Sequence, residues 1–231
     1  MTSPSPAIVV REVGLRDGLQ ILPRTVPTEH KLEWLRAAHA AGLREIEVGS
    51  FVPARLMPQL ADTAVIVEAA RKLPGLVNSV LVPNVKGAHA AIEAQADVML
   101  LPLSASRAHS LANLRKTPDE VVEEIARIRS LRDASGSTCL LEVGFSTAFG
   151  CTIQGRVDED EVVRLVKAVL AAGAERIGLA DTGGYADPLQ VERLFERCFA
   201  VAGDRLTCGH FHDTRGLGLA ITERLLDSGA A

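Results

Sequence analysis

The chain has 231 residues, of which 47% are hydrophobic and 23% charged, and its formal net charge is -4. This composition is typical of a globular protein and excludes a disordered or collagen-like chain, while the negative charge argues against nucleic acid as a partner. No apolar run approaches the roughly 18 residues of a membrane-spanning helix. We therefore expect a globular protein with a small-molecule partner, bound to neither nucleic acid nor membrane.

The cysteines and the N-terminus bear on where the protein works. Four cysteines are scattered along the chain without a C-x-x-C pair, which is typical of free thiols in a reducing compartment. The first residues contain no basic cluster and no hydrophobic segment, so no targeting peptide is visible. The sequence predicts a cytoplasmic location.

Apolar runs alternate with amphipathic segments along the first half of the chain. A short buried strand is expected at 8–10, followed by a helix that Thr28 caps and that ends at Ala41-Gly42. Further strands are expected over 45–48, 77–82 and 98–103, with helices over 60–73 and 86–94. Near-continuous apolar strands alternating with such helices indicate a parallel sheet covered by helices.

Three helices of the second half begin with similar residues. Thr117–Glu120, Asp158–Glu161 and Asp187–Gln190 each offer a capping side chain and an acid or amide three positions later. This is the capping-box pattern, twice with proline at the first helical position. Strands are expected between and after these helices, over 139–145, 176–180 and 206–212.

The count of strand–helix units predicts the fold class. Seven units follow one another over residues 1–231 without a domain linker, and a TIM (β/α)8 barrel has eight. The predicted fold is therefore an α/β barrel of the TIM type in one domain, lacking its eighth strand–helix unit. We expect the sequence to stop, after Asp227–Ala231, where an eighth strand would begin, so that the domain is truncated at its C-terminus.

Polar residues at the carboxyl ends of the strands are the candidates for chemistry, because active sites of such barrels lie there. The strongest signal is the H-x-H of His210 and His212, which alternation along a strand sends to one face while Phe211 faces the other way. Two imidazoles on one face can bind one metal ion. Asp213 is a candidate cap for the helix that follows.

A second cluster follows the first strand, where Arg16 and Asp17 lie side by side before a glycine. Asp17 would complete a set of two imidazoles and one carboxylate, although a solvated Arg–Asp pair in a turn is the commoner outcome for such a sequence. The donor set suits Mg²⁺ or Mn²⁺, with Zn²⁺ as a further candidate.

Other strand ends add weaker candidates. Glu47 is expected to point into the interior, where a carboxylate needs a partner such as Arg16 or Arg11. Asp181 either orients a histidine or forms a turn. Weak signals also come from side chains that follow the fourth and fifth strands, namely Ser104, Ser106, His109, Ser146 and Thr147.

Six short motifs together suggest a family. They are R-D-G-L-Q at 16–20, I-E-x-x-S-F-V at 46–52, V-P-N at 82–84, Gly150-Cys151, D-T-x-G at 181–184 and H-x-H-D-T at 210–214. In this order, and over almost the whole chain, they resemble the 3-hydroxy-3-methylglutaryl-CoA (HMG-CoA) lyase family. The resemblance implies a TIM barrel that cleaves a 3-hydroxyacyl-CoA to acetyl-CoA and a keto acid such as acetoacetate, in leucine degradation. It also implies a divalent metal and a homo-oligomer, expected to be a dimer.

The same resemblance assigns roles to residues. It implies that Asp17, His210 and His212 bind the metal, and that Arg16 polarises the thioester carbonyl and stabilises the enolate. Gln20, Glu47 and Asp181 match supporting active-site positions, and Ser50 lies in a matched motif as a candidate for substrate binding. Two alternatives stay open. One is a Claisen-type synthase of the isopropylmalate synthase kind, and the other is a truncated barrel that binds without turnover.

Overall fold

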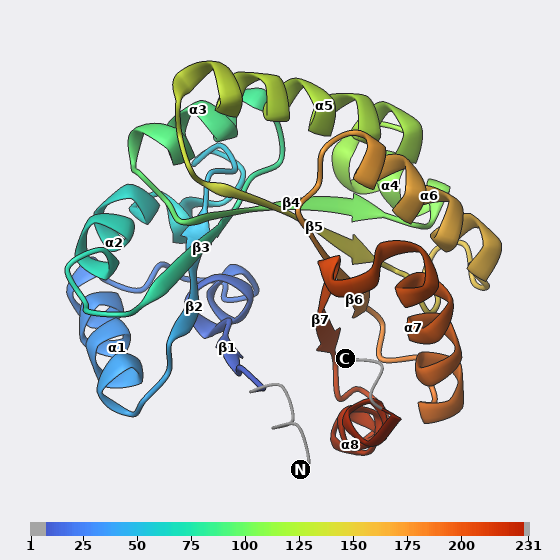
Figure 1. The fold of residues 1–231 in the computed structure, drawn as a ribbon. Helices are drawn as coiled ribbons and strands as arrows, with labels where there is room; N and C mark the ends of the chain where they lie inside the picture. The colour runs from blue at the N-terminus through green and yellow to red at the C-terminus, as the bar shows by residue number, and fades with distance from the viewer. Residues whose placement is uncertain (1–7, 229–231) are drawn as a thin grey trace, which may run out of the picture. The chain divides into compact units, whose positions relative to one another are not determined.

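The computed structural model describes residues 8–228, which fall into two compact units. The first unit runs to Met99 and includes 135–139, and the second contains 100–134 and the chain from Leu140 onward. The strands follow one another in chain order, β1 to β7, and the pairs described within each unit are parallel, as predicted (Figure 1). That residues 1–231 form a single domain stays a prediction.

The strands of the described residues are β1 Arg11–Glu12, β2 Glu45–Ser50, β3 Val77–Leu81, β4 Val98–Ser104, β5 Leu140–Ser146, β6 Arg176–Asp181 and β7 Leu206–Phe211. The α-helices are α1 Thr28–Ala40, α2 Thr63–Ala70, α3 Val85–Glu93, α4 Arg107–Leu114, α5 Pro118–Ser135, α6 Glu159–Ala171, α7 Pro188–Ala202 and α8 Gly218–Ser228. A π-helical turn spans Gly14–Gly18, and 3-10 turns span Pro58–Leu60 and Gly203–Arg205.

In the first unit, β1 pairs with β2 and β2 with β3, with Arg11 opposite Glu45 and Glu47 opposite Ser79; the register of β2 against β3 shifts between Glu47 and Gly49. Strand β2 is buried on both faces after its first residue, as expected for a parallel strand covered by helices. Helices α1 and α2 lie side by side in Figure 1 and bury their apolar faces in this unit. The carboxyl ends of β1 and β2 thereby come to one edge, where the candidate residues lie.

The start of α1 differs from the prediction. Thr28 is the first helical residue and does not cap the helix; its hydroxyl donates to Asp62 at 2.7 Å. Asp62 also accepts from Lys31, whose ammonium group is buried and donates to the carbonyl of Gln59 as well. A buried lysine needs such a partner, and the helical pattern alone gave no sign of it.

In the second unit, β5, β6 and β7 pair in order, and helices α6, α7 and α8 lie side by side in the same order (Figure 1). The inner faces of α6 and α7 are apolar, with Val162, Val166, Val191 and Leu194 fully buried. This packing fixes β7 against its neighbour and so sets the direction of the histidines that it carries.

The predicted caps of the second half are largely confirmed. Thr117 and Glu120 bond reciprocally before α5, as a capping box does. Asp158 accepts from the amide of Asp160 and Asp187 from that of Gln190, but neither receives a bond back from the acid or amide three positions on. In those two helices Glu161 pairs with Arg164 and Gln190 donates to the carbonyl of Phe149.

One local prediction is wrong, and one helix was missed. Residues Ile8, Val9 and Val10 form no strand and are 57–67% exposed, since the first pairing with β2 begins only at Arg11. Helix α4 was not expected; Ser106 caps it by accepting from the amide of His109.

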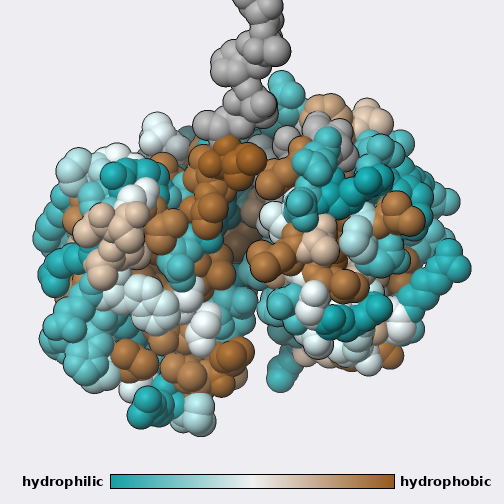
Figure 2. Space-filling model, turned by 90° about the horizontal axis from the view of Figure 1, so that it is seen from below, coloured by the Kyte–Doolittle hydropathy of each residue, from teal (hydrophilic) through white to brown (hydrophobic). Residues whose placement is uncertain are grey.

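Apolar side chains are exposed on the face drawn in Figure 2. In residues 8–228, no helix is both long enough and apolar enough to cross a bilayer.

Candidate functional site

The segment after β1 forms a π-helical turn, which presents Arg16 and Asp17 at the carboxyl end of that strand. Such turns are rare and occur frequently at functional sites. Gly14 begins the turn, and a Cβ atom at this position would lie 2.4 Å from the ring of Trp34. A glycine is therefore required here for the indole to pack against the turn.

Arg16 and Glu47 form a buried bidentate ion pair within the first unit. The Nε and Nη2 atoms of Arg16 donate to the two carboxylate oxygens of Glu47 at 2.7 and 2.9 Å. The arginine is 7% exposed and the glutamate 1%. The prediction that Glu47 needs an arginine partner is confirmed with Arg16, while Arg11 pairs with Glu45. Two parallel bonds fix the plane of the guanidinium as well as its position.

Arg16 also donates from Nη1 to Asp17 at 2.7 Å. A guanidinium has five N–H donors, and these contacts use three of them. Two donors of Arg16 therefore have no acceptor among residues 8–228. A buried cation with unused, fixed donors is the arrangement that recognises an oxygen atom carrying negative charge.

The charges of this cluster depend on one another. Burial alone would lower the pKa of Arg16, but the carboxylates of Glu47 and Asp17 raise it above its usual value. Burial raises the pKa of Glu47, and the guanidinium of Arg16 opposes that effect. Arg16 therefore stays a cation throughout the physiological pH range.

Gln20 also holds the carboxylate of Asp17. Its amide donates to Oδ1 of Asp17 at 2.6 Å, and Arg16 donates to the same oxygen. These two bonds fix the orientation of the half-buried carboxylate. Hydrogen bonds thus join Arg16, Asp17, Gln20 and Glu47 within the first unit, and their roles in catalysis and binding stay predictions.

Ser50, at the end of β2, is 2% exposed. Its hydroxyl donates to the carbonyl of Leu81 at 3.2 Å and accepts from the amide of Val52. The side chain thus shapes the turn after β2, and its role in substrate binding stays a prediction.

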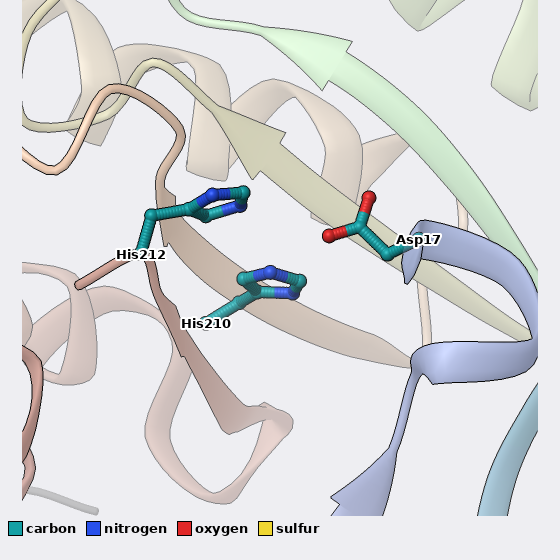
Figure 3. Close-up of side chains that lie close together, drawn as sticks. All are labelled: Asp17, His210 and His212. Atoms are coloured by element: carbon teal, nitrogen blue, oxygen red, sulfur yellow. The ribbon is translucent and has the colours of Figure 1, made fainter. Parts of the chain in front are cut away.

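In the second unit, β7 presents the two histidines as alternation predicts. The rings of His210 and His212 stack, with centroids 5.1 Å apart, and extend from the same side of the strand (Figure 3). The ring of Phe211 instead packs against Phe149 and Phe195, at 6.2 and 6.3 Å between centroids. This aromatic cluster anchors β7 and holds the imidazoles on the opposite face.

Two nearby acids shape loops of the second unit. Asp181 is fully buried, and its two oxygens accept from the amides of Tyr185 and Ala186 at 2.9 Å each. These bonds favour the turn-forming alternative over a bond to a histidine. Asp213 accepts from the amide of Gly218 at 2.7 Å and so caps α8, as predicted.

The donor types fit a divalent cation. The second unit provides two imidazoles on one strand face, His210 and His212, and the first unit provides the fixed carboxylate of Asp17. Mixed imidazole and carboxylate donors are typical of sites for Mg²⁺, Mn²⁺ or Zn²⁺. The residues present are therefore compatible with the predicted metal.

The sequence analysis gave too little weight to one group of side chains, Ser104, Ser146 and His109. Ser104 lies at the end of β4, and its hydroxyl contacts Nδ1 of His109 at 2.7 Å and the hydroxyl of Ser146 at 2.9 Å. Single hydroxyls in loops gave only a weak signal. A signal was present in the sequence. Ser106 three residues before His109 fits a helix N-cap, and a helix that begins there carries the imidazole of His109 in its first turn, close to the end of β4.

The HMGL-like family model matches residues 7–231. The chain belongs to the HMGL-like family. Hydroxymethylglutaryl-CoA lyase YngG of Bacillus subtilis is 33% identical over 213 residues, which cover 92% of this chain and 71% of that protein. A 3-hydroxy-3-isohexenylglutaryl-CoA/hydroxymethylglutaryl-CoA lyase of Pseudomonas aeruginosa is 33% identical over 90% of this chain and 69% of its own length.

A solved structure of an HMGL-like relative confirms the fold class. The HMG-CoA lyase of Acinetobacter baumannii, in complex with coenzyme A and 3-methylmalate, matches with a TM-score of 0.90 and 37% identity. The match covers 99% of this chain and 74% of the other. The predicted resemblance and the predicted α/β fold of the TIM-barrel type are both confirmed.

Proposed function

We propose that this HMGL-like chain is a divalent-metal-dependent carbon–carbon lyase. Its substrate is a 3-hydroxy-3-methylglutaryl-CoA-like thioester, which it cleaves to acetyl-CoA and a keto acid such as acetoacetate. Family membership and relatives named for this activity support the reaction class. The observation that carries the proposal is the Arg16–Glu47 pair, whose buried guanidinium keeps two donors unused.

The metal ligands that we propose are Asp17, His210 and His212. Mg²⁺ or Mn²⁺ is the expected ion, with Zn²⁺ as the further candidate. When bound, a divalent ion lowers the pKa of a coordinated hydroxyl and orients the bond to be cleaved. Gln20 and Arg16 hold Asp17 in one orientation before the ion binds, so little rearrangement is needed.

Arg16 stabilises the charge that cleavage creates. When the C2–C3 bond breaks, its electron pair moves onto the thioester and forms an enolate oxygen. The two unused N–H donors of Arg16 are available to that oxygen, and fixed donors aimed at developing charge are commonly the largest catalytic contribution. Glu47 holds the guanidinium in place, and Asp17 is the carboxylate that we assign to accept the proton of the 3-hydroxyl.

The remaining assignments have smaller roles. Asp181 supports the site by fixing the turn after β6, and Ser50 lines the substrate-binding side of β2. The acyl substituent stays open, because the relatives include a lyase named for an isohexenyl substrate. A dimer and a cytoplasmic location complete the proposal. The four cysteines form no disulfide among residues 8–228, which accords with a reducing compartment.

A metal and turnover experiment tests this proposal. Thermal unfolding is followed with and without Mn²⁺ for the parent protein, for Asp17→Ala and His210→Ala, and for the matched control His89→Ala on the exposed surface of α3. We expect Mn²⁺ to raise the melting temperature of the parent and of His89→Ala only. Equal stabilisation of all four proteins would contradict the site.

Product analysis then tests the reaction. The Mn²⁺-loaded protein is incubated with 3-hydroxy-3-methylglutaryl-CoA, and acetyl-CoA and acetoacetate are measured. A second sample receives acetyl-CoA with a 2-oxo acid, and free thiol is measured. Thiol release in the second sample alone would favour the condensing synthase, whereas metal binding with neither product would favour a binding protein.

A further inference from the structure

The carboxyl ends of β4, β5 and β6 are tied together by hydrogen bonds in the second unit. Thr147 accepts from the amide of Ser106 at 3.0 Å, and its own amide donates to the hydroxyl of Thr182 at 2.8 Å. Thr147 is buried and has a φ of 58°, which is a strained conformation for a β-branched residue. Strain of this kind persists where the surroundings fix it, and it clusters at ligand sites.

A chain of hydrogen bonds runs along these strand ends to His109. The hydroxyl of Ser146 donates to the carbonyl of Leu103 at 3.3 Å and contacts the hydroxyl of Ser104 at 2.9 Å. Ser104 in turn contacts Nδ1 of His109 at 2.7 Å. Ser104 is 1% exposed, so its hydroxyl has no access to solvent as an alternative partner.

Only one arrangement of protons satisfies all three contacts. The proton of Ser146 goes to Leu103, so Ser104 must donate to Ser146. The oxygen of Ser104 then accepts, and His109 must donate from Nδ1. A neutral imidazole that carries its proton on Nδ1 has an acceptor at Nε2. Burial lowers the pKa of His109 and so favours this neutral form.

The Nε2 atom of His109 has no partner among residues 8–228, and the side chain is half-buried. Ser106 caps α4 through the amide of His109, and Gln154 fixes the hydroxyl of Ser106 at 3.0 Å. The imidazole is thus held from its backbone and from Nδ1, and one acceptor atom remains for a ligand. None of the assigned metal or enolate-binding residues belongs to this group.

We propose that His109 is a substrate-binding residue, whose Nε2 accepts a hydrogen bond from an N–H or O–H group of the acyl-CoA. The inference rests on the proposed function and names a contact that the reaction itself does not require. The donor is either an amide N–H of the pantetheine arm or a hydroxyl of the acyl group. A carboxylate, which only accepts, is a poor partner for this atom.

The state of the imidazole is tested first, without any ligand. Long-range ¹H–¹⁵N NMR spectra of the parent protein and of His109→Gln identify the signals of His109 and the protonated nitrogen. We expect a neutral ring with its proton on Nδ1. In Ser104→Ala, where Nδ1 loses its acceptor, we expect the proton to move to Nε2. A parent ring that is protonated on Nε2 would overturn the proposal.

Binding is tested next by calorimetry in the presence of Mg²⁺, with free coenzyme A and a 3-hydroxyacyl-CoA as ligands. We expect His109→Phe to weaken binding about three- to tenfold, as loss of one neutral hydrogen bond does. His109→Gln, which keeps an acceptor, should restore part of the affinity. Ser104→Ala should also weaken binding although the imidazole remains, which a purely space-filling role would not cause. The matched control is His89→Phe on the exposed surface of α3.

The two ligands separate the outcomes. Weaker binding of both ligands to His109→Phe identifies an amide of the pantetheine arm as the donor, and weaker binding of the 3-hydroxyacyl-CoA alone identifies the hydroxyl. Parent-like affinity of His109→Phe for both ligands overturns the inference and leaves the proposed function standing. A parent protein that binds neither ligand contradicts the proposed function and this inference together.

Discussion

Two arginine–glutamate pairs, one in each unit, resemble each other in chemistry and differ in position. Arg16 lies in the turn after the carboxyl end of β1, and its partner Glu47 lies within β2. Arg132, in the last turn of α5, pairs with Glu175, the residue before β6, through two bonds of 3.2 Å. In β/α barrels the carboxyl ends of strands carry activity and the amino ends carry stability. The second pair lies at an amino end.

The partners of the two pairs differ accordingly. Glu175 also accepts from the amide of Leu141, and Arg132 also donates to Asp133. That pair therefore joins α5 to the starts of β5 and β6. The Arg16–Glu47 pair instead joins the π-helical turn after β1 to β2, and Arg16 also donates to Asp17. The two pairs therefore differ in their place in the fold and in the elements that they join.

The largest expected effect comes from Arg16→Lys. A lysine keeps the charge but cannot form the planar, two-bonded fork. We expect turnover to fall about 100- to 1,000-fold, as on removal of one fixed donor to developing negative charge, while stabilisation by Mn²⁺ is retained. Steady-state kinetics and thermal unfolding check this. Arg132→Lys is the matched control, and an equal loss of turnover in both variants would remove the distinction between the pairs.

Glu47→Gln should have the next largest effect. The amide lacks the charge that holds the guanidinium, so Arg16 loses its fixed position while staying in the site. Misplacement by about 1 Å can lower the rate about 100-fold, and we expect kcat to fall by roughly this much with KM nearly unchanged. Initial-rate measurements separate the two constants. A raised KM with unchanged kcat would show that Glu47 contributes to binding instead.

Arg132→Leu should instead affect stability. It removes a guanidinium that is 5% exposed and its bonds to Glu175 and Asp133. Both carboxylates keep access to solvent, so we expect a loss of about 1–3 kcal/mol in the free energy of unfolding. Urea unfolding measures the loss, and turnover at 25 °C should match the parent. Lower turnover with an unchanged unfolding midpoint would contradict the structural role.

Much of the candidate site could be predicted from the sequence, because the motifs that carry it are local. Arg16, Asp17 and Gln20 occur within five residues, and alternation alone places His210 and His212 on one face. An arginine partner for Glu47, either Arg16 or Arg11, was also expected, since an interior carboxylate needs a cation.

Other features depend on distant residues and gave no local signal. Lys31 is buried only because Asp62 and the carbonyl of Gln59 meet its ammonium group. Ile8–Val10 have the composition of a strand but no neighbour in register, so they form none. His109 acquires its orientation from two serines on different strands. Such contacts follow from packing, which periodicity does not encode.

The smallest expected effect is a pH dependence in the structural pair. Burial alone would raise the pKa of Glu175, but the Arg132 guanidinium and the amide of Leu141 lower it below its usual value. The unfolded chain therefore takes up this proton at a higher pH than the folded protein does. The stabilisation from ionised Glu175 is complete above the unfolded pKa of about 4.3, and it is lost as the pH falls through the folded pKa.

Glu175→Gln removes this proton linkage. We expect the variant to be less stable than the parent at pH 7, and the difference in free energy of unfolding to shrink as the pH falls below about 4.3. Urea unfolding from pH 3 to pH 7 measures that difference, and in the Arg132→Leu background we expect most of its pH dependence to disappear, since Arg132 is the only cation that bonds Glu175 in the described chain. A difference that grows toward low pH would mean that Glu175 is held in its protonated form, and the pair would then resemble a neutral hydrogen bond more than the charged pair of Arg16 and Glu47.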